Sequence, residues 1–146
     1  MSTEAKPASR HASRQAAIQM LYALQLGTPA VVPADRELSR AINEFWDHFS
    51  APEGARDYAD LLVRGVVGTL ARLDERLTRA STNWRLERMA RIDLAILRLA
   101  AWELTESLEV PREVAIDEAV ELAKTFSSDE AGKFVNGVLA GLVSHT

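Results

Sequence analysis

The sequence predicts an all-α protein, a compact bundle of about six or seven helices. Apolar residues recur three and four residues apart along most of the chain, which is the spacing of one face of a helix. No stretch shows sustained alternation of apolar and polar residues between hairpin turns, as strands would. With 146 residues the chain has the size of one ordinary domain and can bury a single core.

The first element is a helix of about 17 residues that starts near Ser9, a residue type favoured at the N-cap. Residues 1–9 are small, polar and without apolar periodicity, so we expect a flexible basic arm there and a single domain over residues 10–146. The helix carries an apolar stripe and then meets a glycine and a proline that end it. The stripe consists of Ala17, Met20, Leu21 and Leu24.

Two further helices follow in the first half of the chain. Residues 38–49 form a strongly amphipathic stretch that Ser50 and Pro52 stop. Residues 55–80 keep their leucines and valines on one side, which predicts one long helix. Gly65 and Gly68 weaken that helix and would allow a close neighbour.

The second half predicts a short helical turn at 86–89 and three longer helices. One runs from residue 92 and ends before Pro111, the next covers 114–126, and the last is capped within residues 127–129. Arg98 interrupts the apolar face of the first of these. We expect it to form an ion pair with Glu118 or Glu121 on the next helix, in a structural role.

Charge is unevenly distributed along the chain, although the net charge is −4. Residues 1–27 hold three basic residues against one acidic residue, and residues 72–91 hold six against three. Residues 106–131 hold eight acidic residues against two basic ones. Such asymmetry suits a protein that offers one face to a polyanion and another to a basic partner, and it equally suits solvated helix faces.

Nothing in the sequence predicts catalysis, a cofactor or a metal site. The chain has no cysteine, and its three histidines are scattered without other ligands at metal-binding spacing. No phosphate-binding glycine loop and no nucleophile-elbow motif is present, so a small hydrolase has no positive feature in its favour. We expect no signal peptide and no membrane span, and we place the protein in the cytoplasm.

Two segments go beyond helical periodicity. Residues 10–22 read RHASRQAAIQMLY, a basic start that runs into a helix. Residues 95–104 read AILRLAAWEL and are followed by VPREVAIDEAVELAKTF at 110–126 and KFVNGVL at 133–139. In order and spacing these segments resemble the NusB family over residues 10–26 and about 60–142. The helical module is also similar to the N-terminal domain of some ribosomal RNA cytosine methyltransferases, but we expect no methyltransferase domain in a chain of this length.

The resemblance implies an RNA-binding antitermination factor. A NusB-like protein would pair with ribosomal protein S10 (NusE), bind single-stranded boxA RNA with it, and join the RNA polymerase antitermination complex that reads through terminators in ribosomal RNA operons. With its acidic balance and few cations, this chain is expected to bind RNA poorly alone and to need the partner.

The resemblance also implies site residues. On the positions that match the family, RNA contacts would come from the basic start and from the beginning of the last helix, and the protein partner would be met elsewhere. The RNA group is Lys6, Arg10, His11, Arg14, Glu130, Lys133, Phe134 and Asn136; the partner group is Tyr22 and Asp93.

Two alternatives stay open at this point. Phe134 falls on an apolar stripe with Val138, so it is either a base-stacking ring or a core residue. The whole chain is either an RNA-binding adaptor or a protein-binding helical scaffold or homodimer, in which the basic start is a solvated helix end.

Overall fold

The computed structural model describes residues 7–107 and 109–144, and it confirms the all-α fold. The described residues form seven α-helices and one short 3-10 helix, without a strand. Their bounds are α1 Pro7–Leu24, α2 Asp35–His48, α3 Ala55–Gly68, α4 Leu70–Ala80, η1 Leu86–Arg88, α5 Arg91–Thr105, α6 Arg112–Phe126 and α7 Asp129–Ser144.

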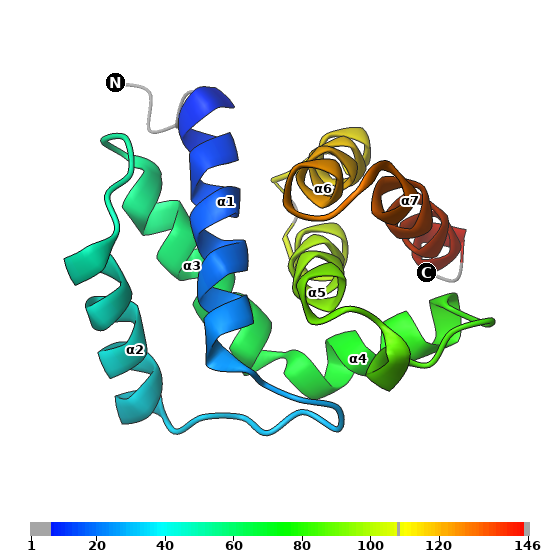
Figure 1. Ribbon diagram of the computed structural model, residues 1–146, viewed down its shortest axis with the longest axis horizontal. Helices are drawn as coiled ribbons and strands as arrows, with labels where there is room; N and C mark the ends of the chain where they lie inside the picture. Colours follow the sequence, from blue (N-terminus) through cyan, green and yellow to red (C-terminus); the bar gives the residue numbers. More distant parts are fainter. Residues whose placement is uncertain (1–6, 108, 145–146) are drawn as a thin grey trace.

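The helices gather into two groups that share α5. In Figure 1, α1 lies between α2 and α5 and packs along α3, which forms the first group. The second group is α5, α6 and α7, and α4 starts at the end of α3 and runs beneath this second group. α5 contacts α1, α3, α4, α6 and α7. Its residues 94–101 are all buried, as expected for a helix that is apolar on nearly every side.

The predicted long helix over 55–80 is wrong, because the chain breaks at Thr69 into α3 and α4. Thr69 leaves the helical region at φ −124° and ψ 18°, and its hydroxyl donates to the carbonyl of Gly65 at 2.8 Å. The break turns α4 so that its leucines enter the core between α5 and α7. Low helix propensity at Gly65 and Gly68 makes this interruption cheap.

The expected close neighbour is present at one of the two glycines. A Cβ atom placed on Gly65 would lie 2.4 Å from Cε2 of Trp102 on α5, whereas one placed on Gly68 would meet nothing within 4 Å. Gly65 is therefore a point at which α3 lies close to α5.

The starts of the first and last helices, α1 and α7, were not predicted equally well. Ser128 caps α7 as expected, since its Oγ accepts a hydrogen bond from the amide of Ala131 at 3.1 Å. Ser9 is not a cap, because α1 begins at Pro7, a residue suited to the first helical position. Residues 7–9 of the expected arm are thus helical, and residues 1–6, with Lys6, lie outside the described residues.

Candidate nucleic-acid interface

The basic start of α1 faces two other helices. The guanidinium of Arg10 lies 3.7 Å from the centroid of the Tyr58 ring on α3, a cation–π contact. His11 points the other way, and its Nδ1 lies 2.7 Å from Oε2 of Glu118 on α6. Both side chains of that pair are partly exposed, at 40% for His11 and 26% for Glu118. The first turns of α1 therefore join α3 to α6.

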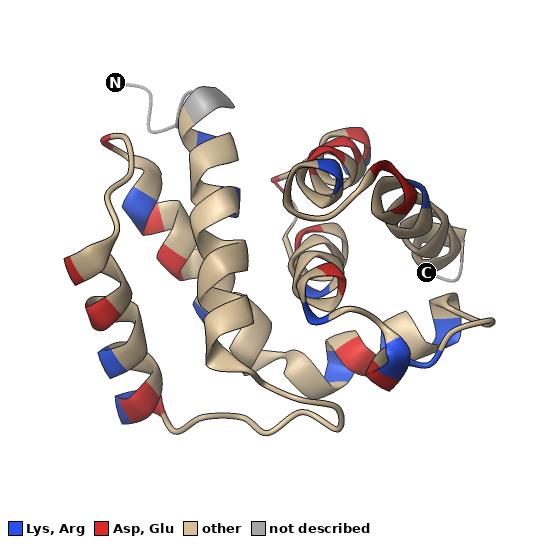
Figure 2. Cartoon of the chain, in the orientation of Figure 1, with Lys and Arg blue, Asp and Glu red and all other residues tan. Residues whose placement is uncertain are grey.

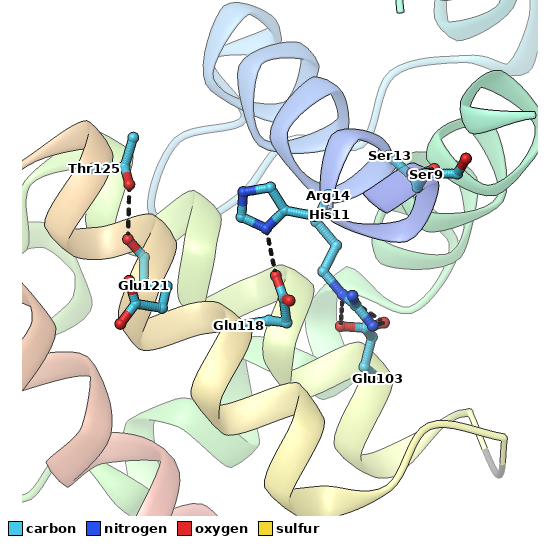
Figure 3. A network of polar contacts seen from close by, with 8 residues as sticks. All are labelled: Ser9, His11, Ser13, Arg14, Glu103, Glu118, Glu121 and Thr125. Carbon is cyan, nitrogen blue, oxygen red and sulfur yellow. Dashed lines mark hydrogen bonds and ion pairs between the residues drawn. The ribbon is translucent and has the colours of Figure 1, made fainter. Parts of the chain in front are cut away.

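Arg14, one turn further along α1, is buried in an ion pair. Its Nε donates to Oε1 of Glu103 at 2.9 Å and its Nη2 donates to Oε2 at 3.0 Å, with 4% of the Arg14 side chain exposed and 1% of the Glu103 side chain. The hydroxyl of Tyr58 donates to the same carboxylate. Figure 3 shows His11 and Arg14 leaving α1 toward Glu118 and Glu103. The guanidinium expected to contact RNA is thus enclosed and bound to a carboxylate in this structure.

The pKa values around Glu103 reflect this burial. Burial raises the pKa of the Tyr58 hydroxyl far above its ordinary value, and the neighbouring Glu103 carboxylate raises it further. For Arg14, burial lowers the pKa, but the hydrogen bond and the charge of Glu103 outweigh it and raise the net value. Arg14 therefore stays charged, and Tyr58 stays protonated as a donor, throughout the physiological range.

Arg98 forms an inter-helix ion pair as expected, but its partner is not one of the two expected glutamates. Its Nε and Nη2 donate to the carboxylate of Asp74 on α4 at 2.9 and 2.8 Å, and Nη2 also donates to the carbonyl of Gly27 at 2.8 Å. The expectation of a partner on α6 was wrong, because the break at Thr69 places α4 against this face of α5.

The first turns of α7 hold the second group of expected RNA contacts. Lys133 and Glu130 are largely exposed and lie 3.8 Å apart between Nζ and Oε1. Asn136 is exposed, and Phe134 is half-buried against the core. The Phe134 ring also meets the ring of Trp84 edge-on, with centroids 6.1 Å apart. Phe134 thus packs partly against the core and partly against an exposed ring, and its stacking on a base stays a prediction.

A pocket joins Phe134 to residues of other elements. Its wall is formed by the segment before α5, the first turn of α5, and the junction between α6 and α7. We call it the Trp84 pocket; its lining includes Trp84, Arg88, Asp93, Ser127, Glu130 and Phe134. The structure therefore brings Asp93, expected to face the protein partner, together with Glu130 and Phe134, expected to lie near RNA.

Tyr22, the other expected partner contact, lies at the far end of α1 from the basic start. Its side chain is 41% exposed, and the guanidinium of Arg91 lies 5.0 Å from its ring centroid. The loop that follows α1 exposes Val31 and Val32, at 75% and 56%. Tyr22 is therefore exposed beside a cation, and the loop after α1 adds exposed apolar side chains of its own.

Trp84 and Arg88 are candidate site residues that the sequence reasoning missed. Trp84 is 55% exposed in a turn, outside any apolar stripe. A large aromatic residue beside serine, threonine, asparagine and arginine in a predicted turn was the signal available, since such a ring has no helical face to bury it.

Charge on the surface follows the uneven distribution in the sequence. Figure 2 shows acidic residues along α6 and at the start of α7, and basic residues along α4 and the segment after it. His11, Arg14 and Lys133 each lie within salt-bridge distance of a carboxylate, whereas Arg10 lies over the ring of Tyr58. No helix among the described residues is long and apolar enough to cross a membrane.

Comparison with known proteins covers nearly the whole chain. A family model described as the NusB family matches residues 11–144. The chain is similar to the transcription antitermination protein NusB of Sorangium cellulosum (strain So ce56), with 50% identity over 131 residues that cover 90% of this chain and 89% of the relative. It is similar to NusB of Anaeromyxobacter dehalogenans (strain 2CP-C), with 42% identity and coverage of 92% and 90%.

Solved structures of the same fold are also found. NusB of T. maritima superposes with a TM-score of 0.77 at 30% identity, over 97% of this chain and 93% of that one. A crystal structure of the antitermination factors NusB and NusE in complex with dsRNA gives a TM-score of 0.76 at 24% identity, over 97% of this chain and 100% of that one, and it supports the likeness in fold.

Proposed function

The chain belongs to the NusB family, and from this premise we propose that it is a transcription antitermination factor that binds boxA RNA together with ribosomal protein S10 (NusE). It acts as a binding protein in the RNA polymerase antitermination complex, without an enzymatic activity of its own, and it works in the cytoplasm. Its relatives in Sorangium and Anaeromyxobacter are named transcription antitermination proteins, and the match covers about nine-tenths of each of them.

One observation carries the RNA role: α6 connects the two groups of expected RNA contacts. His11 of α1 is hydrogen-bonded to Glu118 in the middle of α6. α6 ends at Phe126, and Glu130 and Lys133 lie in the first turns of α7, which begins three residues later. Eight residues of α6 separate these points, or about 12 Å along the helix. A few nucleotides of a single strand can cover that distance and touch both groups.

The carboxylates beside the cations support dependence on a partner. RNA must compete with Glu118 for His11 and with Glu130 for Lys133, so the net gain from each phosphate contact is small. A basic partner that binds beside this surface adds cations and contact area, and two linked weak sites bind far more tightly than either alone. Tyr22 and the exposed valines of the loop after α1 are the surface that we assign to NusE.

Within this proposal Arg14 serves the site indirectly. Its pair with Glu103 fixes α1 against α5, and the Tyr58 hydroxyl bonded to the same carboxylate holds the ring on which Arg10 lies. Arg10 and Lys133 are the cations that we assign to phosphate.

Removing these two cations is expected to weaken RNA binding and to flatten its dependence on salt. Arg10→Ala combined with Lys133→Ala should lower the slope of log affinity against log salt concentration by about 1.4, since each neutralised phosphate of a single strand contributes about 0.7. The measurement is fluorescence anisotropy of labelled boxA RNA with the protein–NusE mixture at several salt concentrations. NusE binding should stay at the wild-type level.

The matched control is Arg36→Ala with Arg40→Ala, two exposed cations of α2, which Figure 1 shows on the far side of α1 from α6. It should leave the slope unchanged. If both double variants had the same effect, Arg10 and Lys133 would contribute only to a general attraction between charges and would not be specific RNA contacts. If NusE did not raise boxA affinity of the wild-type chain at all, the protein-binding scaffold or homodimer would be the better account, and light scattering of the free chain would separate those two.

A further inference from the structure

The loop after α1, residues 25–34, forms a wall between two surface pockets. The first pocket lies between the loop and the start of α5, and its lining includes Tyr22. The second lies between the loop and α4, and its lining includes Val32. Thr28 lines both pockets. The loop therefore connects Tyr22 to the exposed valines, and its position shapes the surface that we assign to NusE.

The loop has little support of its own. Of residues 25–34 only Leu26 is buried, and a hydrogen bond from the amide of Val31 to the carbonyl of Leu26, at 2.8 Å, closes the loop on itself. Its backbone is left-handed at Gln25, with φ 50°, and at Gly27, with φ 81°. That conformation is uncommon for residues other than glycine. Such an exposed segment needs a contact from outside to keep one position.

Arg98 of α5 supplies a contact of this kind. Its Nη2 donates to the carbonyl of Gly27 at 2.8 Å and to Oδ2 of Asp74 at 2.8 Å, and its Nε donates to Oδ1 of Asp74 at 2.9 Å. The arginine is buried, with 4% of its surface exposed. Because the carboxylate holds two N–H groups at once, it fixes the plane of the guanidinium and aims the remaining Nη2 hydrogen at the loop. The loop is thus tied to α4 and α5 together.

The chemistry of the second pocket fits a protein better than RNA. Its charged lining residues are all acidic, namely Asp74, Glu75 and Glu87. Carboxylates repel the phosphates of RNA, whereas an apolar protein segment that carries a lysine or arginine matches both the charge and the exposed Val32. The loop that Arg98 holds therefore belongs to the side of the molecule that suits the protein partner.

We propose that Arg98 is a positioning residue for partner binding, which holds the loop after α1 in the position that binds NusE. Asp74 aims the guanidinium, and the carbonyl of Gly27 is the point at which the loop is held. Without this bond the loop samples other positions, and the partner has to select the competent one at a cost in affinity. The assignment rests on the proposed function and adds to it a buried residue that acts through the loop.

The test is Arg98→Lys in the full chain. Lysine keeps a positive charge beside Asp74, but its single ammonium does not reproduce the planar fork that also reaches Gly27. NusE affinity, measured by isothermal titration calorimetry, is expected to fall about 10-fold, as it does when one molecule in ten has the competent loop. Hydrogen exchange at the Val31 amide, measured without NusE, is expected to speed up. A general loss of stability does not produce this local change at a temperature well below unfolding.

Gly27→Ala disturbs the same contact and leaves the ion pair of Arg98 and Asp74 in place. A Cβ on Gly27 would meet the carbonyl oxygen of Pro29 at 3.5 Å, an ordinary contact, so the effect comes from the left-handed backbone. This variant should also lower NusE affinity. In the double variant with Arg98→Lys the combined loss should be smaller than the product of the two single losses, because both changes break one contact.

The matched control is Arg72→Lys, at another ion pair of α4. Nη2 of Arg72 lies beside Oε1 of Glu106, the residue after α5, and Arg72 lines neither of the two pockets. This variant should keep the NusE affinity and the Val31 exchange rate of wild type. An equal loss in Arg72→Lys and Arg98→Lys would overturn the proposal, because the effect would then be one of general stability.

Tyr22→Ala separates this proposal from the proposed function. Wild-type NusE affinity in Arg98→Lys and Gly27→Ala, with a loss in Tyr22→Ala, would overturn the positioning role and leave NusE on its assigned surface. Faster Val31 exchange without a loss of NusE affinity would overturn it as well, since the position of the loop would then not matter for binding. If the wild-type chain did not bind NusE at all, the proposed function itself would fall, and the role of Arg98 with it.

Discussion

Glu103→Ala is expected to destabilise the folded chain by about 3–5 kcal/mol, because it leaves the buried guanidinium of Arg14 without its counter-charge. The variant also removes the acceptor of the Tyr58 hydroxyl, which is buried at the same place. The measurement is urea unfolding followed by circular dichroism, with the midpoint and slope fitted together. A shift in midpoint at constant slope reports the loss of stability.

The matched control is an ion pair on the surface of α4. Nη2 of Arg79 lies 3.4 Å from Oε1 of Glu75, and both side chains are more than 60% exposed, at 64% and 69%. Glu75→Ala should therefore cost less than about 1 kcal/mol. A second variant, Arg14→Met with Glu103→Leu, removes both charges and should recover most of the stability lost in Glu103→Ala. Equal costs for Glu103→Ala and Glu75→Ala would contradict the burial of the Arg14 pair.

Gly65→Val is the second change with a large expected effect, a destabilisation of about 1–3 kcal/mol from overpacking. The Cβ atom would lie 2.4 Å from Cε2 of Trp102 and 2.6 Å from its Cζ2, so the indole or the α3 backbone has to move. Trp102 is a rigid ring packed against the core, and it cannot yield as the end of a lysine would. Thermal unfolding by calorimetry, with Trp fluorescence as a second probe, measures the effect.

Gly137→Ala serves as the comparison because Gly137 is also a helical glycine, but one with room for a side chain. A Cβ on Gly137 would meet nothing within 4 Å, and the residue lies inside α7. Alanine should stabilise the chain by about 0.5–1 kcal/mol through its better helix propensity. Opposite signs for Gly65→Val and Gly137→Ala are the expected result. A stabilising Gly65→Val would show that the Trp102 contact is not tight.

Helical periodicity was enough to place most elements, because it is a local property of the chain. The 3.6-residue spacing of apolar side chains located α2, α5, α6 and α7 within a few residues, and the capping serine before α7 was readable as well. The break at Thr69 could not be predicted from the sequence, since the apolar spacing continues across it. The packing of α4 against α5 and α7 decides it.

The candidate site was predicted less evenly. Arg10 and Arg14 are one turn apart and look alike in sequence, yet Arg10 is only partly buried, over the ring of Tyr58, whereas Arg14 is buried in an ion pair. A signal did exist: Arg14 lies three residues before Ala17 and seven before Leu21, on the apolar stripe that enters the core. Its partner Glu103 is 89 residues away and could not be identified by local spacing.

Residue types in a local order were enough to predict the all-α class, the approximate helices and the resemblance to the NusB family. The three-dimensional structure was needed to show which charges are buried in pairs, where the long helix breaks, and that Trp84, Asp93 and Phe134 share one pocket. Burial and pairing depend on contacts between elements that are distant in the chain, and local spacing does not predict such contacts. Those contacts turn one arginine into a part of the core and leave another beside the surface where RNA is expected to bind.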